Sequence, residues 1–374
     1  MTDMQEIQRY PLPSGYYSLG YFQHRYPEID WIICLENINN ETQIANLKSK
    51  ISKSLKNNKK VALVIWDEII IFPVSAIMTN FLNSYSDKPV WLITQLDPMC
   101  QLMYTFQHGL TCKIIELPWL WLNDTLVYYQ VHNAVQPTNT TGSTSYICMV
   151  GNIIARHKLD LVRELQKQNL DQYGLITVLT PLEEFKNNKY IQVNPVPPYK
   201  NLKTKYSKMA AQVCCKTILT QEDIWISGNV ENFLHIEKTY SDIPLVIQPE
   251  SSVGIFQNSE KSLWPLLLGK MTLIYSRPGQ VKNMQRFYDF DISNYANLAF
   301  DVCDGYDDQA NNLRLQMMLS DNKDLIKNSR DIYSQFCVDL EKARWSIGQN
   351  LLDFCHAQIE VILNKEKQIN DLNS

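Results

Sequence analysis

The chain has 374 residues, a length that suits two domains better than one. Its composition, 45% hydrophobic and 20% charged, is typical of a globular protein, and a net charge of −4 argues against a protein that coats nucleic acid. No basic and apolar leader opens the chain and no run of about 18 apolar residues occurs, so we expect no membrane span and a cytoplasmic location. The nine cysteines include no CxxC pair, which favours buried thiols over zinc or redox use.

The first part of the chain alternates between strand and helix patterns. Short apolar runs predict strands at Trp31–Leu35, Val61–Trp66, Val90–Ile93 and Lys113–Glu116, and helical periodicity predicts helices at Glu41–Leu55 and Ser75–Leu82. Such alternation is typical of a parallel sheet with helices on both faces. The polar segment Asn133–Ser145, with one proline and one glycine, then predicts a linker, so we place the first domain at 1–140 and the second at 141–330.

The same alternation restarts after the linker. It predicts a strand at Tyr146–Val150, a helix at Leu159–Gln168 and a strand at Leu175–Leu179. Three basic residues, Arg156, His157 and Lys158, precede the predicted helix. Because cations are disfavoured at the N-terminal end of a helix, they indicate an anionic ligand nearby, and the alternative is a solvated helix start.

The most informative stretch is Leu245–Arg286. Its pattern predicts a strand at Leu245–Ile247, a polar loop, a helix that is capped at Asn258 or Ser259 and ends at Gly269, a strand at Met271–Tyr275, and a tight turn at Arg277-Pro278-Gly279. Glu260 and Lys261 fall in the first turn of the helix. An acid there can simply complement the helix dipole, or it can accept hydrogen bonds from ribose hydroxyls while Lys261 meets a diphosphate.

The C-terminal part of the chain predicts two further elements. Ala299–Cys303 has the apolar character of a last short strand. Ile332–Leu363 has a long helical period with one apolar face, so we expect residues 331–374 to form a helix that packs back across both domains.

The Leu245–Arg286 stretch resembles the donor-binding segment of fucosyltransferase-like and giant-virus-type glycosyltransferases. The similarity lies in Glu250-Ser251-Ser252, Ser259-Glu260-Lys261, Trp264-Pro265-Leu266 and Gly269-Lys270, with the family's gap of ten residues between the two acids. Asn152 and the basic trio are also similar to the opening of the family's second domain, whereas Ser251 stands where the family usually has Asn. The resemblance covers mainly residues 146–180 and 243–300.

This resemblance implies an α/β fold of two Rossmann-like parallel-sheet domains that face a cleft, a GT-B-like architecture with a long C-terminal helix. It implies a glycosyltransferase that binds a nucleotide-diphosphate sugar on the second domain and the acceptor on the first, and that inverts the sugar without a metal or other cofactor. The candidate donor-binding residues are Glu250, Ser252, Ser259, Glu260, Lys261, Arg156, Lys158 and Arg277. The acceptor class stays open between a glycan, a protein and modified DNA.

An inverting transfer also needs a base that removes the acceptor proton. We expect it at the carboxyl end of a strand in the first domain, where Asp67 or Glu68 is the candidate and Glu36 and Asp97 also qualify by position. The fingerprints of nicotinamide enzymes, P-loop proteins and zinc proteases do not occur. Two alternatives remain: a non-catalytic nucleotide- or sugar-binding module with the same fold, and another two-domain nucleotide-sugar enzyme such as an epimerase.

Overall fold

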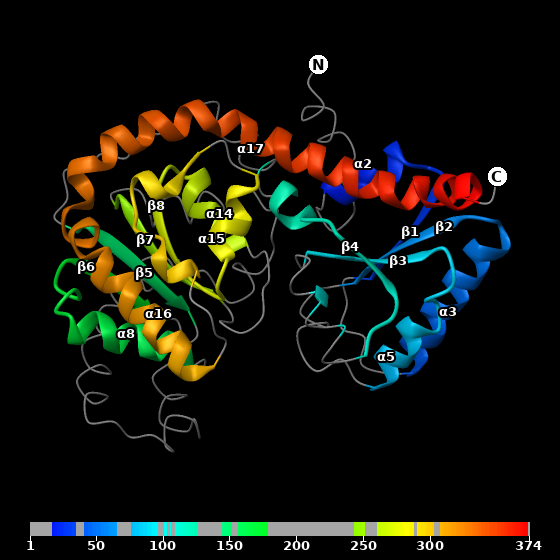
Figure 1. Cartoon of the computed structure of the whole chain (residues 1–374), viewed down its shortest axis with the longest axis horizontal. Helices are drawn as coiled ribbons and strands as arrows, with labels where there is room; N and C mark the ends of the chain where they lie inside the picture. The colour runs from blue at the N-terminus through cyan, green and yellow to red at the C-terminus, as the bar shows by residue number, and fades with distance from the viewer. Residues whose placement is uncertain are drawn as a thin grey trace. The chain divides into compact units, whose positions relative to one another are not determined.

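The computed structural model describes residues 17–34, 41–65, 76–95, 101–102, 105, 109–123, 125, 144–151, 156–178, 243–250, 260–287, 290–302 and 307–372. Within these ranges the fold is α/β, with two sheets of four parallel strands each (Figure 1). The chain divides into two compact units, unit 1 with Met1–Leu126 and Gly348–Ser374, and unit 2 with Val127–Ile347. The predicted α/β class with parallel sheets is confirmed.

The sheet of unit 1 follows the order of the chain. Its strands are β1 (Ile29–Cys34), β2 (Lys60–Ile65), β3 (Val90–Thr94) and β4 (Lys113–Glu116), each paired in parallel with the next. Leu63 of β2 pairs with Ile32 on one side and Leu92 on the other. All five residues of β3 are buried, as expected for a central parallel strand that is covered on both faces. The four predicted strands are therefore confirmed, with shifts of a residue or two at their ends.

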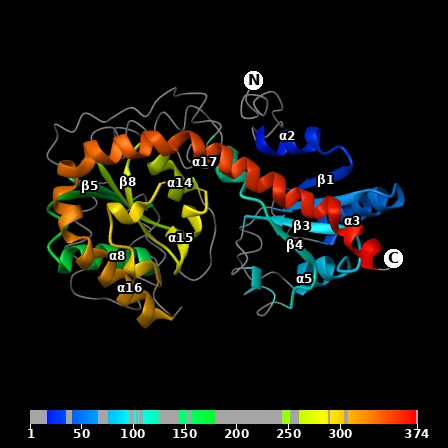
Figure 2. The same cartoon turned by 45° about the horizontal axis from the view of Figure 1, so that its top comes forward.

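Helices α3 (Glu41–Lys56) and α5 (Ala76–Asn83) connect these strands. Because apolar residues recur every three or four positions in α3, Ile44, Leu47 and Ile51 fall on one face and are buried, and α3 packs on β1 and β2. Figures 1 and 2 show α2 (Tyr17–Arg25) and the last part of the C-terminal helix on the other side of the sheet.

The C-terminal helix, α17 (Lys323–Leu372), is long because one apolar face persists along it, and it bends at Asn328. On the predicted face, Phe336, Leu340, Ile347, Leu351, Cys355, Ile359 and Ile362 are buried, and Ile332 is exposed. Its residues before Gly348 belong to unit 2 and the later ones to unit 1. In unit 1, His356 Nδ1 lies 2.6 Å from the Tyr26 hydroxyl, and Lys60 Nζ donates to the Leu363 carbonyl at 2.7 Å.

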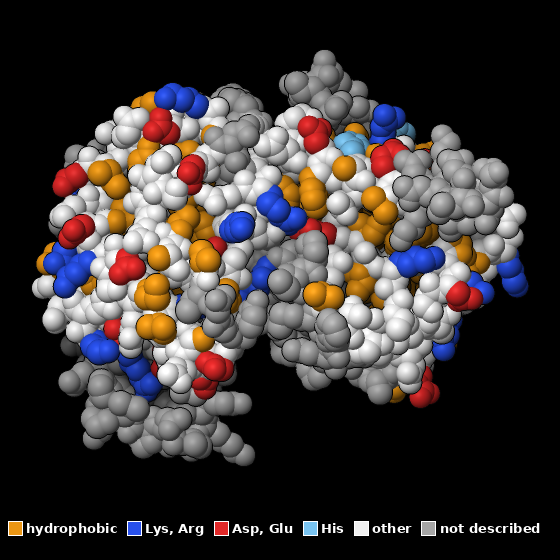
Figure 3. Space-filling model, in the orientation of Figure 1, with side chains coloured by type: hydrophobic (Ala, Val, Ile, Leu, Met, Phe, Trp, Pro, Cys, Tyr) orange, Lys and Arg blue, Asp and Glu red, His pale blue; other side chains and the backbone are white. Residues whose placement is uncertain are grey.

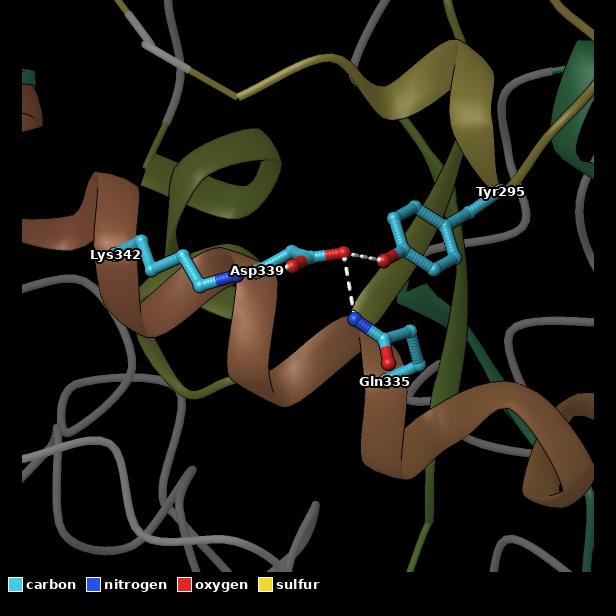
Figure 4. Close-up of polar contacts among 4 residues, drawn as sticks. All are labelled: Tyr295, Gln335, Asp339 and Lys342. Atoms are coloured by element: carbon cyan, nitrogen blue, oxygen red, sulfur yellow. Dashed lines mark hydrogen bonds and ion pairs between the residues drawn. The ribbon is translucent and has the colours of Figure 1, made fainter.

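A polar network connects α17 to Tyr295, which follows the 3-10 helix η1 (Ile292–Asn294) of unit 2. The Tyr295 hydroxyl donates to the Asp339 carboxylate, which also accepts from Gln335 Nε2 and Lys342 Nζ, both at 3.0 Å (Figure 4). The Tyr295 hydrogen bond, with those of Gln335 and Lys342, lowers the pKa of Asp339 to about 2. Burial, together with Asp339, raises the pKa of Tyr295 to about 12. The carboxylate is thus charged and the phenol neutral over the whole ordinary pH range.

The sheet of unit 2 has a different strand order. It runs β6 (Gly174–Val178), β5 (Tyr146–Gly151), β7 (Leu245–Pro249) and β8 (Met271–Tyr275), with all neighbours parallel. The strands predicted at Tyr146–Val150, Leu175–Leu179, Leu245–Ile247 and Met271–Tyr275 are confirmed, with shifts of a residue or two at their ends. The first residue of β6 is a glycine, and a side chain would not fit there. An added Cβ at Gly174 would lie 2.3 Å from the ring of Tyr146, which is fully buried on β5.

Two crossovers of unit 2 leave the centre of the sheet in opposite directions. From β5 the chain passes through α8 (Arg156–Lys167) to β6, and from β7 it passes through α14 (Glu260–Leu267) to β8. Since such connections are right-handed, they place α8 and α14 on opposite faces. Consistent with this, α14 packs on β7 and β8, whereas α8 packs against α16 (Asp308–Asp321), beside it in Figure 1.

One strand prediction is wrong. The structure has a 3-10 helix, η2, at Ala299–Val302 rather than a strand at Ala299–Cys303. Its backbone carbonyls accept hydrogen bonds from other elements. The Asp301 carbonyl accepts from the Gly279 N–H at 2.6 Å, and the Phe300 carbonyl accepts from Nε of the buried Arg314 at 2.9 Å. Backbone groups engaged in this way cannot form a strand ladder. Within the described ranges no helix combines the length and the hydropathy that are needed to cross a bilayer.

Candidate functional site

The candidate site lies at the carboxyl edge of the unit 2 sheet. Strand order reverses there between β5 and β7, because their crossovers leave in opposite directions. Open α/β sheets bind ligands outside the carboxyl ends of their strands at such a reversal, because the diverging connections leave a crevice. Three predicted site residues follow these strand ends: Lys158 after β5, Glu250 after β7 and Arg277 after β8. Residues that are far apart in sequence thus meet at one edge.

Lys158 lies inside the first turn of α8. The helix begins at Arg156, ahead of the predicted start at Leu159, so the basic trio is helical. The Lys158 side chain is only 8% exposed, which makes the alternative of a solvated helix start wrong for this residue. Its charge also acts on the buried thiol of Cys148 in β5, where it opposes the rise in pKa that burial causes. A positive charge is therefore held against the sheet beside the positive end of a helix dipole.

His157, the neighbour of Lys158, bonds to the end of β7. Its Nε2 lies 2.8 Å from the Glu250 carbonyl, and its ring centroid is 6.1 Å from that of Tyr275 in β8. Burial is the main reason that the pKa of His157 falls to about 4, and the nearby charge of Lys158 lowers it further. At neutral pH the imidazole is therefore uncharged.

Glu250, a predicted donor contact, points into the protein. The residue is 3% exposed, and its carboxylate accepts a hydrogen bond from the Ser262 hydroxyl in the first turn of α14. Its backbone N–H donates to the Tyr275 carbonyl at 2.9 Å. Glu250 therefore connects β7, β8 and α14. The sequence pattern did not identify Ser262, because a serine in the first turn of a helix is usually a local capping group.

Arg277 follows β8 and is 3% exposed. Its Nη1 donates to the Pro278 carbonyl at 3.2 Å. Burial raises the pKa of Asp301, while the charges of Arg314 and Arg277 work in the opposite direction. Arg277 thus has an internal carboxylate, that of Asp301, within range of its charge.

The predicted turn after β8 is confirmed. Gly279 has φ +80° and ψ 7°, the left-handed conformation that favours glycine at the third position of such a turn. It leads into α15 (Gln280–Gln285), where the Asp301 carboxylate accepts the Lys282 N–H at 3.1 Å. Gln280 is fully buried, and neither its amide oxygen nor its amide nitrogen has a hydrogen-bond partner within the described part of the chain. The sequence did not single out Gln280 or Asp301, because a polar residue beside a Pro-Gly turn is ordinarily solvated.

The other predicted residues are described only in part. Glu260 and Lys261 are the first two residues of α14, which confirms the predicted helix start, and Arg156 opens α8, but the side chains of all three lie outside the described residues. Ser252, Ser259 and the candidate bases Asp67, Glu68, Glu36 and Asp97 lie outside them altogether. The described ranges contain no group of three or more His, Cys, Asp and Glu residues arranged to hold a metal ion.

Charges of both signs also occur on the molecular surface. Figure 3 shows basic and acidic side chains on the same face, with apolar side chains scattered between them. Lys158, Glu250 and Arg277 differ from these groups because they are buried at the sheet edge. Comparison with known proteins adds no family or relative: no family model, no curated protein and no solved structure matches the chain.

Proposed function

We propose that this chain is a glycosyltransferase that takes the sugar from a nucleotide-diphosphate sugar, bound at the carboxyl edge of the unit 2 sheet. The observation that carries the proposal is Lys158, a cation buried in the first turn of α8 next to the reversal between β5 and β7. A helix N-terminus disfavours a cation and attracts an anion, so this placement suits a phosphate that offsets both positive ends.

The start of α14 supports the same ligand. Glu260 and Lys261 are the first two residues of this helix, and Ser262 follows them. The Ser262 hydroxyl donates a hydrogen bond to the carboxylate of Glu250, which follows β7. The first turns of α8 and α14 therefore both connect to the residue that follows β7. In the proposed complex the two helix starts and Lys158 neutralise the diphosphate, and Glu260 accepts hydrogen bonds from the ribose hydroxyls.

In the proposed reaction the acceptor oxygen forms a bond to the anomeric carbon while the bond from that carbon to the diphosphate breaks. The electron pair leaves with the diphosphate oxygen, whose developing charge the cations and helix dipoles stabilise without a metal. The acceptor proton goes to a carboxylate, for which Asp67 and Glu68 stay the candidates. Attack from the face opposite the leaving group inverts the anomeric centre.

A release assay over a panel of nucleotide-diphosphate sugars tests the proposal. We expect one donor to release its nucleoside diphosphate, and Lys158→Met to slow this release about tenfold to a hundredfold, since a hydrogen bond to a charged group contributes about 1.5–3 kcal/mol. The matched control is Lys167→Met in the same helix, because Lys167 is largely exposed and pairs with Glu164 of that helix. Glu260→Ala should likewise impair release.

Three outcomes would contradict the proposal in different ways. Binding of a nucleotide without any release or transfer would favour the non-catalytic binding module. A changed sugar in the absence of acceptor would favour an epimerase. Equal activity of the Lys158→Met and Lys167→Met proteins, with both shown to be folded by circular dichroism, would mean that the donor does not bind at the sheet edge.

A further inference from the structure

Three residues form a hydrogen-bonded chain across the strand reversal of unit 2. His157 in the first turn of α8 contacts the Glu250 carbonyl at 2.8 Å, over 93 positions of sequence. The Glu250 carboxylate then accepts from the Ser262 hydroxyl in the first turn of α14. Because the crossovers through α8 and α14 leave the sheet in opposite directions, this chain links the starts of two helices that lie on opposite faces of the sheet.

The proton positions in this chain follow from the acceptors. A carbonyl oxygen can only accept, so Nε2 of His157 carries the hydrogen and donates it. A carboxylate also only accepts, so the Ser262 hydroxyl is the donor to Glu250. With the low pKa of His157, near 4, the ring at neutral pH is the neutral tautomer that is protonated on Nε2. Both bonds are therefore made in the resting protein without any change of charge.

Two members of the chain are buried, and the third, His157, is half-buried. Ser262 is fully buried, Glu250 is 3% exposed, and the His157 ring lies against Tyr275. Tyr275 is itself fixed, since its carbonyl accepts the Glu250 N–H and its hydroxyl donates to the Asn311 carbonyl of α16 at 3.2 Å. Groups held on several sides in this way are suited to position other residues rather than to contact a ligand themselves.

We propose that His157, Glu250 and Ser262 form a brace that sets the first turns of α8 and α14 relative to one another, so that Lys158 and the Glu260–Lys261 pair meet one diphosphate. The three are positioning residues, which gives Glu250 a role other than direct donor contact. The identity of the ligand rests on the proposed function, whereas the mechanical link rests on the two hydrogen bonds alone.

The geometric demand explains why such a brace is useful. Helix dipoles and first-turn N–H groups act on an anion only over short distances, and their effect falls off within about the first turn. A misplacement of about 1 Å at a binding or reacting centre costs up to about a hundredfold in rate. A link between two helix starts on opposite faces of a sheet limits this kind of error.

Two substitutions at His157 separate the hydrogen bond from the packing. His157→Phe keeps an aromatic ring against Tyr275 and removes the donor. His157→Gln removes the ring and keeps an N–H donor at a similar distance from the backbone. The first readout is hydrogen exchange of the amides of Trp264, Leu266 and Leu267 in α14 and of 160–163 in α8, with α3 of unit 1 as the internal reference. We expect exchange about tenfold faster in His157→Phe and close to the parent rate in His157→Gln.

The second readout is the affinity for UDP and GDP, measured by calorimetry. We expect the dissociation constant of the bound nucleotide to rise about tenfold in His157→Phe and to return towards the parent value in His157→Gln. Should His157→Phe fail to fold, Ser262→Ala breaks the other bond of the chain with little change in volume and is carried through the same measurements.

Failure of the brace and failure of the proposed function give different results. If the donor-lacking and donor-keeping His157 variants exchange at the same rate, or if neither differs from the parent protein, the brace is wrong. If the parent protein binds neither nucleotide while His157→Phe still accelerates exchange in α14, the link stands and the assignment of a nucleotide ligand falls. Faster exchange together with weaker nucleotide binding supports both.

Discussion

The two sheets of this chain are built from the same kind of strand but differ in how the strands are connected. In unit 1 the spatial order β1-β2-β3-β4 follows the sequence, so successive crossovers advance in one direction. In unit 2 the order β6-β5-β7-β8 reverses at the centre. Only the second arrangement brings the ends of two diverging connections together at one edge, and a reversal of this kind is where open α/β sheets bind ligands.

The polar groups at the two carboxyl edges differ accordingly. In unit 1, Gln95 after β3 is buried and its Oε1 accepts the Leu120 N–H at 3.3 Å, while the Thr94 carbonyl accepts the Leu117 N–H at 2.7 Å. These neutral groups stabilise the next turn of the chain. In unit 2 the edge instead holds the buried cations Lys158 and Arg277. Among the described residues, the unit 2 edge therefore holds buried cations, whereas the unit 1 edge holds these neutral groups and the buried acid Glu116 at the end of β4.

The largest effect is expected where β5 and β6 meet in unit 2. Gly174→Ala places a Cβ 2.3 Å from the buried ring of Tyr146 and should lower the free energy of unfolding by about 3 kcal/mol. Chemical denaturation of the single variant and of the Tyr146→Ala, Gly174→Ala double variant measures this. The penalty for Gly174→Ala should largely vanish in the Tyr146→Ala background, and an equal penalty in both backgrounds would contradict the steric explanation.

The next largest effect is a pH dependence of folding stability that arises from His157 at the unit 2 edge. The pKa of His157 is lowered from 6.5 to about 4, so below pH 6.5 the unfolded chain binds a proton that the folded protein does not. The stability contribution is present above pH 6.5 and is lost as the pH falls towards 4, by about 2.5 kcal/mol at pH 4.5. Denaturation curves at pH 8 and pH 4.5 should show a smaller difference for His157→Gln than for the parent protein. An equal difference in both proteins would mean that His157 has the same pKa in the folded and the unfolded chain.

A stabilising substitution is expected at the start of α15. Because the amide of Gln280 is buried without a hydrogen bond among the described residues, Gln280→Met should raise the free energy of unfolding by about 1–2 kcal/mol. Gln248→Met is the matched control, since Gln248 is also buried but its Nε2 donates to the Pro249 carbonyl at 2.9 Å. If both variants are destabilised alike, the Gln280 amide has a partner in solution.

The smallest effect is expected in unit 1. Tyr26→Phe removes the hydroxyl that lies 2.6 Å from His356 Nδ1 and should lower the free energy of unfolding by about 1 kcal/mol. The affinity for the proposed nucleotide should not change, because this contact lies in the unit whose described strands show no reversal. Thermal unfolding and calorimetry on one preparation check both statements. A loss of nucleotide affinity in Tyr26→Phe would contradict the assignment of the ligand site to unit 2 alone.

Local signals located most of the described elements. Strands β4 and β8 lie at the predicted residues, and α3 buries the apolar residues that its period places together. The prediction failed at Ala299–Val302, where a short apolar run became a 3-10 helix because its carbonyls bond to Gly279 and Arg314. A short run has too few residues for periodicity to distinguish between these outcomes.

The candidate site was predicted by residue type but not by geometry. The basic trio and the Glu250 segment were found from their positions beside strand patterns, and the structure brings Lys158, Glu250 and Arg277 to one sheet edge. The inward direction of the Glu250 carboxylate could not be predicted, because it depends on Ser262 across the loop. Nor did sequence indicate that Gln280 and Asp301 would be buried beside the turn.

The sequence by itself determined the α/β alternation, the apolar faces of α3 and α17, and the turn at Gly279, because these depend on side chains that are close along the chain. Tertiary structure alone decided the reversal between β5 and β7, the neutral state of His157 and its bond to Glu250 across 93 positions. The physical reason is that strand order and burial depend on the packing of segments that are distant in sequence, and local residue patterns do not encode these pairings.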